Sequence, residues 1–381
     1  MPGLKTAIAL LVVLVSGCTH DGGREDAKRP TGPQSGPTYE SGAVSVAEGP
    51  PRTPLDVPFV VGNRFSGIPG ATRSQALGAP INTTFLGTLS PPALLDPGGS
   101  RLLVYSSFDR GIPALRARNI STRKETILER GAYSLAWRGD GALAYVKAPE
   151  PRVRDIARYV GHVVVRNSLR ARPLRWTRKP ARYVVAAWAD DRLLAYRLPG
   201  QTFPDLMIFD APLRARMLAR KSALVALSPD ARYALVARYG SSPPLVRILA
   251  VADGAEVGRL VLDKEETSAV TFIAESGSWV DDTVFAPVTY GVAAFRVRPP
   301  EIELEQLLEF DTEMFPIGPL EPRAAEDGRR ILLWAELQAQ PREAVPPVGV
   351  FQCDRVERAC SEVAQGPSFP GARIVYNPSR P

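Results

Sequence analysis

One pattern of apolar and polar positions recurs through most of the chain. In SLAWRGDGALAYVKA, residues 134–148, a short apolar stretch is followed by a Gly-Asp-Gly turn and then by a stretch of alternating apolar residues. Such alternation predicts two β-strands joined by a tight turn. Related phrases begin at Leu94, Val185, Val225, Gly277 and Ala324. Their turn aspartates follow one another at intervals of 40 to 51 residues and are Asp96, Asp140, Asp190, Asp230, Asp281 and Asp327.

Each phrase is followed by two further strand-like runs. After Asp230 the chain reads YALVARY, then LVRILAV, then EVGRLVL, with turn residues between the runs. Counting the strand before the turn, each repeat holds four strands, and repeats of this size predict the blades of a β-propeller. We therefore predict an all-β propeller with six blades, seven being the alternative. Residues 81–88 and 372–378 are expected to close the ring.

The turn aspartates have a structural explanation. An aspartate at the head of a tight turn accepts hydrogen bonds from backbone amides two residues on, and a following glycine tolerates positive φ. The phrases WRGDGALAYV and LSPDARYALVAR resemble the W-S-P-D-G-x-x-I-A-F repeats of Tol-B-like propellers, relatives of WD-repeat proteins. The resemblance covers roughly residues 84–375, and it implies the fold and an envelope scaffold role. The phrase of Asp96 lacks the tryptophan, and Trp279 is followed by Val-Asp-Asp without glycine.

The N-terminus carries a different pattern. Lys5 precedes nine apolar residues, 7–15, which is the layout of a secretory signal peptide and too short for a membrane-spanning helix. The last residue of this run, Val15, and the two that follow, Ser16 and Gly17, are small or branched and directly precede Cys18, and this arrangement resembles the bacterial lipoprotein signal. The resemblance implies a lipid on Cys18 and anchoring to the bacterial cell membrane, facing the periplasm or the cell exterior. An ordinary signal peptide with an incidental cysteine is the alternative.

Composition divides the rest of the chain. After a signal peptide of residues 1–17, residues 18–80 are rich in glycine and proline without a sustained apolar period, which predicts a mostly disordered tether. Within it, the more apolar residues 55–65 are the part expected to dock if any does. The propeller is expected over residues 81–381. An apolar content of 45% with 23% charged residues agrees with a globular domain.

The two remaining cysteines, Cys353 and Cys360, flank a predicted hairpin in FQCDRVERACSEV. An exported chain folds where disulfides persist, so we predict a disulfide that clips this hairpin. Two reduced, buried thiols are the alternative. A metal site is disfavoured, because neither thiol has a histidine or a second cysteine pair nearby in the sequence.

Catalytic motifs are scarce in the sequence. It has two histidines, His20 in the predicted tether and His162 in a strand-like run, and no nucleophile elbow, zinc-protease motif or phosphate-binding loop. We interpret His162 as an ordinary strand residue. Carboxylate pairs remain the enzymatic option, but the pairs at 190–191 and 281–282 fall in turns that the repeat explains. We expect no cofactor and no metal, and we favour a non-enzymatic protein while leaving the question open.

Two stretches carry charge of one sign. Residues 152–182 hold ten basic residues and one acid, whereas residues 301–326 hold eight acids and one base. Solvated outer edges are one explanation, and contact of the basic stretch with phosphate-bearing lipid or wall polymer is the other. Nucleic acid is disfavoured as a partner of an exported protein. The candidate residues for an anionic contact are Arg166, Arg170, Arg172, Arg175, Arg178 and Lys179.

These patterns together predict a lipid-anchored, extracytoplasmic β-propeller that acts as a non-catalytic scaffold. Its expected partner is another envelope protein or an anionic envelope polymer, and the net charge of +7 favours anionic material. The alternative is a receptor for a small molecule or polymer, or a carboxylate-dependent hydrolase, that works at the central channel. Loops on the two faces of a propeller suit either role.

Overall fold

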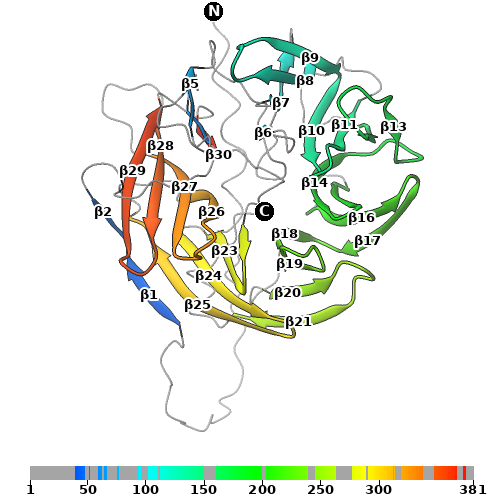
Figure 1. Ribbon diagram of the computed structural model, residues 1–381. Coiled ribbons are helices and arrows are strands. Elements are labelled where there is room, and N and C mark those ends of the chain that lie inside the picture. The colour runs from blue at the N-terminus through cyan, green and yellow to red at the C-terminus, as the bar shows by residue number, and fades with distance from the viewer. Residues whose placement is uncertain are drawn as a thin grey trace, which may run out of the picture. The chain divides into compact units, whose positions relative to one another are not determined.

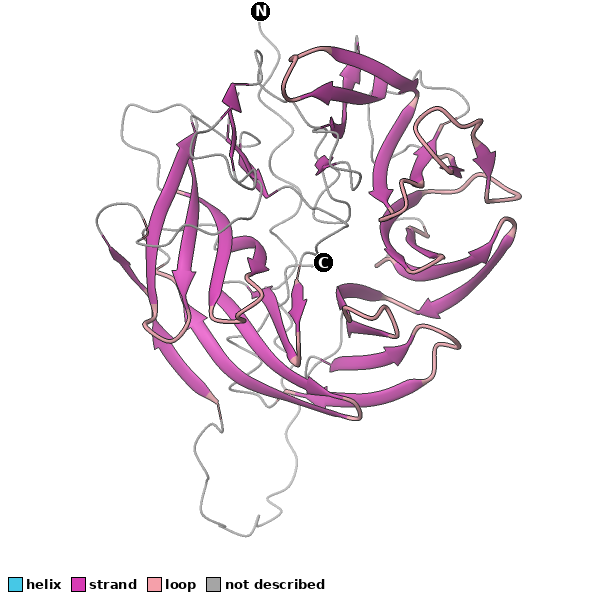
Figure 2. Cartoon of the chain, viewed as in Figure 1, coloured by secondary structure: helices cyan, strands magenta, loops and turns pink. Residues whose placement is uncertain are grey.

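The computed structural model consists of β-strands and loops over the residues that it describes (Figures 1 and 2). The chain divides into residues 1–36 and 37–381, and all described residues lie in the second unit. The all-β prediction is confirmed for these residues. They are 39–47, 51, 59–61, 64–66, 75–76, 93–95, 102–109, 112–148, 160–199, 203–238, 245–262, 277–288, 291–311, 313, 319–337, 347–366 and 372–374.

The described strands form seven sheets, and six of these contain four strands that are consecutive in the chain. In Figure 1 the sheets succeed one another around a centre, as the blades of a propeller do. The first three consist of β6 (Ala93–Leu95), β7 (Leu102–Asp109), β8 (Ile112–Asn119) and β9 (Glu125–Arg130); of β10 (Ala132–Trp137), β11 (Leu143–Lys147), β12 (His162–Arg166) and β13 (Leu174–Arg175); and of β14 (Tyr183–Ala189), β15 (Arg192–Arg197), β16 (Asp205–Ala211) and β17 (Arg214–Ala219).

The next three sheets follow the same order of antiparallel neighbours. They consist of β18 (Ser222–Leu227), β19 (Tyr233–Arg238), β20 (Leu245–Ala250) and β21 (Glu256–Val261); of β22 (Ser278–Val280), β23 (Thr283–Val288), β24 (Gly291–Arg298) and β25 (Glu301–Glu309); and of β26 (Pro319–Ala324), β27 (Arg330–Glu336), β28 (Val348–Asp354) and β29 (Ala359–Gly366). Two of them gain a fifth strand from the N-terminal part of the chain.

Burial changes across a sheet as the propeller fold requires. Every residue of β10 and of β23 is buried, whereas β9 and β21 carry several exposed residues. Inner strands are covered on both faces by neighbouring sheets, so their sequences are almost continuously apolar. The outer strands lie at the rim and therefore mix polar with apolar positions.

Apolar clusters join each sheet to the next. One cluster combines strands β10–β12 with β14–β16, another combines β14–β16 with β18–β20, and a third combines β18–β20 with β22–β25. Hydrogen bonds cross the same boundaries: the Ser134 hydroxyl accepts from the Val185 amide at 2.7 Å, and the Tyr196 hydroxyl accepts from the Leu224 amide at 2.7 Å. Because a sheet buries its apolar faces only against its neighbours, the sheets stabilise one another.

The seventh sheet joins the two ends of the chain. Its strand order is β30–β3–β4–β5, with β3 (Phe59–Val61), β4 (Arg64–Ser66), β5 (Gln75–Ala76) and β30 (Ala372–Ile374). The preferred count of six blades is therefore corrected to seven, the alternative count, because this sheet lacks the aspartate phrase on which the count rested. Residues 372–374 take part in closure as predicted, whereas residues 81–88 lie outside the described part of the chain.

The expected domain boundary at residue 80 is also corrected. Strand β1 (Glu40–Ala43) pairs in parallel with β25, and β2 (Ser45–Ala47) pairs in parallel with β29. Backbone hydrogen bonds on the free edge of a sheet require no apolar sequence, so composition does not reveal such strands. Strand β3 and the first two residues of β4 lie within residues 55–65, the stretch that was expected to dock. For the remaining residues of 18–80 the tether stays a prediction.

Candidate functional site

Three of the turn aspartates cap their own turns. Asp140 accepts a hydrogen bond from the Ala142 amide at 3.1 Å, Asp230 from the Arg232 amide at 3.1 Å, and Asp327 from the Arg329 amide at 2.9 Å. In each case the acceptor is the side chain and the donor lies two residues on. This is the geometry of a turn-stabilising aspartate, and it occupies carboxylate oxygens that a catalytic role would need.

Two other turns use their aspartates differently. Asp190 and Asp281 have φ values of 56° and 50°, in the left-handed region that aspartate tolerates better than most residues. Their hairpins are tighter, because Ala189 pairs with Arg192 and Val280 pairs with Thr283, so two residues make the turn. These aspartates therefore serve the backbone conformation. Asp96 lies outside the described residues.

The capping contacts lower the pKa values of the carboxyl groups. For Asp140 the largest cause is the hydrogen bond from the Arg138 side chain. For Asp230 and Asp327, burial by itself raises the pKa, but hydrogen bonds from the Ser228 hydroxyl and from the amides of the turns outweigh it. All three groups are therefore held ionised, which is the opposite of what a general acid needs.

The depressed pKa values predict a specific loss of stability in acid. A carboxyl group whose pKa is lower in the folded state contributes stability above its unfolded pKa, about pH 4, and loses that contribution as pH falls through the folded pKa. We expect the urea midpoint to fall less steeply between about pH 5 and pH 2.5 in an Asp230→Asn, Asp327→Asn double variant than in the wild type. Urea titrations at a series of pH values would measure this difference.

The matched control for that experiment is Glu362→Gln. Glu362 is exposed, and its side chain makes no hydrogen bond or ion pair within the described residues. This variant should follow the wild-type pH dependence. Identical pH slopes in the wild type and the double variant would contradict a stabilising role of the turn carboxylates.

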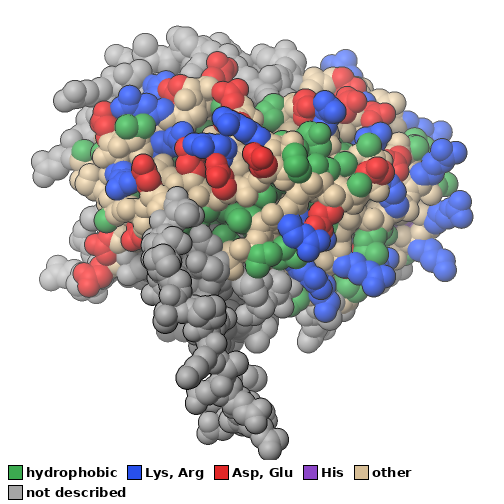
Figure 3. All heavy atoms as spheres, turned by 90° about the horizontal axis from the view of Figure 1, so that it is seen from below, with side chains coloured by type: hydrophobic (Ala, Val, Ile, Leu, Met, Phe, Trp, Pro, Cys, Tyr) green, Lys and Arg blue, Asp and Glu red, His purple; other side chains and the backbone are tan. Residues whose placement is uncertain are grey.

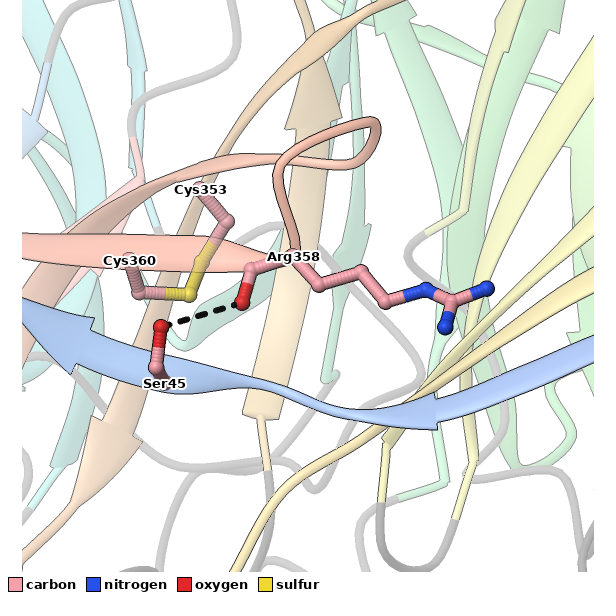
Figure 4. Close-up of a disulfide and its surroundings, with 4 residues drawn as sticks. All are labelled: Ser45, Cys353, Arg358 and Cys360. Carbon is pink, nitrogen blue, oxygen red and sulfur yellow. Dashed lines mark hydrogen bonds between the residues drawn. A yellow bond between two sulfur atoms is a disulfide. The ribbon is translucent and has the colours of Figure 1, made fainter.

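The predicted disulfide is present and joins Cys353 of β28 to Cys360 of β29 (Figure 4). The two residues face each other directly in the strand pairing, and both are buried. Strand β2 lies on the other side of Cys360, where the Ser45 hydroxyl donates to the Arg358 carbonyl oxygen at 3.4 Å. A loop this short should contribute about 2 to 3 kcal/mol. The disulfide thus holds the outer hairpin on which the N-terminal strand β2 docks.

His162 lies at the start of β12, and its Nδ1 atom is 3.1 Å from the Thr177 hydroxyl oxygen. Burial and the nearby charge of Arg175 lower the pKa of the imidazole, so it is neutral at physiological pH. Within the described residues no three His, Cys, Asp or Glu side chains are placed to hold a metal ion. His20 lies outside those residues.

Sequence reasoning missed a charged cluster in the sheet β6–β9. Glu125 of β9 binds Arg116 and Arg118 of β8 and accepts a hydrogen bond from the Tyr105 hydroxyl. These contacts lower the pKa of Glu125, although its burial alone would raise it, and they leave Arg118 only 6% exposed. The alternation of Arg116 and Arg118 on one face of a strand was the available signal. Because Glu125 is paired with both arginines and with the Tyr105 hydroxyl, we interpret this cluster as structural.

The structure separates the six candidate residues for an anionic contact. Arg166 is partly buried, donates to the Tyr145 hydroxyl and forms an ion pair with Glu129, so its charge is already compensated. The other five are exposed, and none has a carboxylate within ion-pairing distance in the described part of the molecule. Three exposed cations at the ends of β17 likewise have no carboxylate within ion-pairing distance among the described residues. Together these eight residues form what we call the basic edge: Arg170, Arg172, Arg175, Arg178, Lys179, Arg214, Arg220 and Lys221.

The acidic stretch behaves differently from the basic edge. Glu303 and Glu305 of β25 form ion pairs with Arg296 of β24 at 3.2 and 2.7 Å, and Glu305 also lies 3.7 Å from Arg355. The charge of the acidic stretch is therefore partly neutralised within the sheets.

In Figure 3, Lys and Arg side chains gather along the right-hand margin, on the side where β13 and β17 lie in Figure 1.

Comparison with known proteins addresses the fold. No protein-family model and no curated protein matches the sequence. TolB from Acinetobacter baumannii shares 14% identity at a TM-score of 0.43, over 66% of this chain and 65% of TolB. Putative TolB from Agrobacterium tumefaciens shares 12% at 0.43, over 69% and 91% of the two chains. The β-propeller domain of the trilobed protease from Pyrococcus furiosus shares 12% at 0.46, over 76% and 83%.

These likenesses are distant and concern the fold alone, and the chain spans less than two thirds of the A. baumannii protein. In the described part of the chain, no helix is long and apolar enough to cross a membrane. The fold assignment rests on the seven sheets and on the clusters that join them. The chain is accordingly a β-propeller.

Proposed function

We propose that this protein is a lipid-anchored, extracytoplasmic β-propeller that acts as a non-catalytic scaffold for another protein of the cell envelope. The anchor is the acylated Cys18, at the end of the signal-like apolar run. The scaffold is the rigid set of sheets, whose loops and edges are available to a partner.

The disulfide supports the extracytoplasmic location. Bonds between cysteines persist in oxidising compartments and are rare in reducing ones. Cys353 and Cys360 are paired directly across two strands, and neither is exposed. Together with the exported character of the N-terminus, the bond favours a chain that folds outside the cytoplasm.

One observation carries the non-catalytic part of the proposal. Every described carboxyl group whose pKa is displaced from its ordinary value is displaced downward, and each is held by arginine side chains, a neighbouring hydroxyl or turn amides. Carboxylate-dependent hydrolysis requires one group with a raised pKa to donate the proton. The described carboxyl groups are suited to holding turns and strand edges.

Crosslinking in intact cells tests the scaffold role. We expect a lysine-directed crosslinker to capture one dominant envelope protein with the tagged, anchored chain. The exposed lysines of the described residues, Lys124, Lys179 and Lys221, would report which part of the surface the partner touches. Mass spectrometry of the crosslinked peptides identifies both sides of the contact.

The control variant replaces these three lysines with arginine, which keeps the charge and removes the reactive amine. It should lose the crosslinks at these three positions while it retains the partner in a purification without crosslinker. Recovery of no protein partner by either route would contradict the scaffold proposal and direct attention to a small molecule or polymer at the central channel.

A further inference from the structure

The basic edge spans two neighbouring sheets that meet at a defined contact. The Leu213 amide, in the turn between β16 and β17, donates to the Trp176 carbonyl oxygen just after β13 at 3.0 Å. The turn of one sheet is thereby fixed against the outer strand of the preceding sheet. Cations on the two outer strands consequently belong to one surface, although they lie far apart in the sequence.

Exposed apolar side chains lie among these cations. Leu174 is 53% exposed, Leu213 is 47% exposed and Met217 is 37% exposed. Each lies on or beside one of the two outer strands that carry the basic edge. Single exposed apolar residues are common on protein surfaces, so the relevant observation is that these three lie on the same two outer strands as the cations of the basic edge.

Among the described residues, no carboxylate compensates the charge of this surface. Residues 160–189 and 211–229 contain no aspartate or glutamate at all. Asp205 and Asp210, which lie on β16 beside β17, are already in ion pairs: Asp205 with Arg197, and Asp210 with Arg192 and Arg216. The eight cations of the basic edge thus face solvent with no carboxylate partner within the described residues.

We propose that the basic edge and its three apolar side chains dock the propeller onto an anionic lipid bilayer. This inference rests on the proposed function, because an acylated Cys18 would already hold the chain at a membrane. The roughly 20 residues between Cys18 and Tyr39 could span at most about 70 Å, a length that would let this edge reach the surface of the same membrane.

Charge and apolar exposure favour a bilayer over other anionic partners. Each Lys or Arg near an anionic leaflet strengthens binding about fivefold, without any need for a shaped pocket. Leucine and methionine gain by entering the boundary between headgroups and acyl chains, as on interfacial helices. A soluble anionic polymer offers the charge but no apolar layer, so it would leave Leu174 and Leu213 in water.

The test uses the full, lipid-bearing chain reconstituted into vesicles. One set contains phosphatidylcholine alone and the other also contains phosphatidylglycerol. A fluorophore is attached at Ser168→Cys, an exposed position beside the basic edge, or at Gln365→Cys, an exposed control position on β29. Quenching by a lipid-borne acceptor reports how close each label lies to the bilayer. Flotation reports whether the protein is held on the vesicle at all.

We expect Ser168→Cys to be quenched more strongly on phosphatidylglycerol vesicles than on neutral ones, with the difference removed by high salt. Gln365→Cys should show no such difference. Arg172→Gln with Arg175→Gln should weaken docking about 30-fold. The matched pair Arg232→Gln with Arg259→Gln, whose side chains are 72% and 61% exposed elsewhere on the ring, should leave docking unchanged. Leu174→Ser with Leu213→Ser should weaken docking on anionic vesicles without altering flotation.

Equal quenching on both vesicle types, with normal flotation, would overturn the docking proposal and leave the anchor intact. Flotation with anionic vesicles only would support docking and contradict the acylated anchor, and flotation with neither would overturn both. Shielding of the Ser168 label by polyglutamate, without a response to anionic vesicles, would assign the basic edge to an acidic protein and overturn the lipid assignment.

Discussion

Replacing Cys18 with alanine should transfer nearly all of the protein from the membrane fraction to the soluble fraction. The acyl chains on that cysteine would be the durable anchor, because the nine apolar residues before it are too few to span a bilayer. Two or more acyl chains give stable anchoring to a membrane, whereas the basic edge alone would bind weakly and in a salt-dependent way. Cell fractionation at high salt, followed by detection of the protein, measures the transfer.

Ser16→Ala provides the control for this experiment. It alters the same signal segment but keeps a small residue before the cysteine, so the variant should remain in the membrane fraction. Mass spectrometry of the N-terminal peptide should find the lipid on Cys18 in the control. Full membrane retention of Cys18→Ala at high salt would contradict the lipid anchor and with it the first half of the proposed function.

Gly258→Ala should lower the free energy of unfolding by at least about 2 kcal/mol. A Cβ atom on Gly258 of β21 would lie 2.0 Å from the Pro300 carbonyl oxygen, in the turn between β24 and β25 of the next sheet. A backbone oxygen cannot rotate away as a flexible side chain can, so the two sheets would have to separate. Urea unfolding followed by tryptophan fluorescence measures the loss.

The matched control is Arg259→Ala, on the adjacent residue of the same strand. Its side chain is 61% exposed and pairs with Glu256, a surface contact that contributes little. We expect its urea midpoint to stay near that of the wild type. A Gly258→Ala midpoint as high as the Arg259→Ala midpoint would indicate that the sheets can move apart without cost, contrary to the packing described above.

Local patterns in the sequence predicted much of the fold. The alternation around Asp140, Asp230 and Asp327 predicted strands and turns, because a hairpin is determined by residues that are close in sequence. The pairing of Cys353 with Cys360 was predictable for the same reason, since their hairpin brings them together. Arg166, by contrast, was grouped with the exposed arginines, because sequence proximity does not reveal the Glu129 that faces it from the preceding sheet.

What the sequence determined by itself was the all-β class, the repeating four-stranded unit and the disulfide hairpin, all of which arise from short-range periodicity. The tertiary structure decided the seventh sheet, the docking of β1 and β2, and the joining of β13 with β17 into one basic edge. These depend on backbone pairing and contact between distant segments. Such contacts are made by hydrogen bonds that any residue can form, so they leave no periodic signature in the chain.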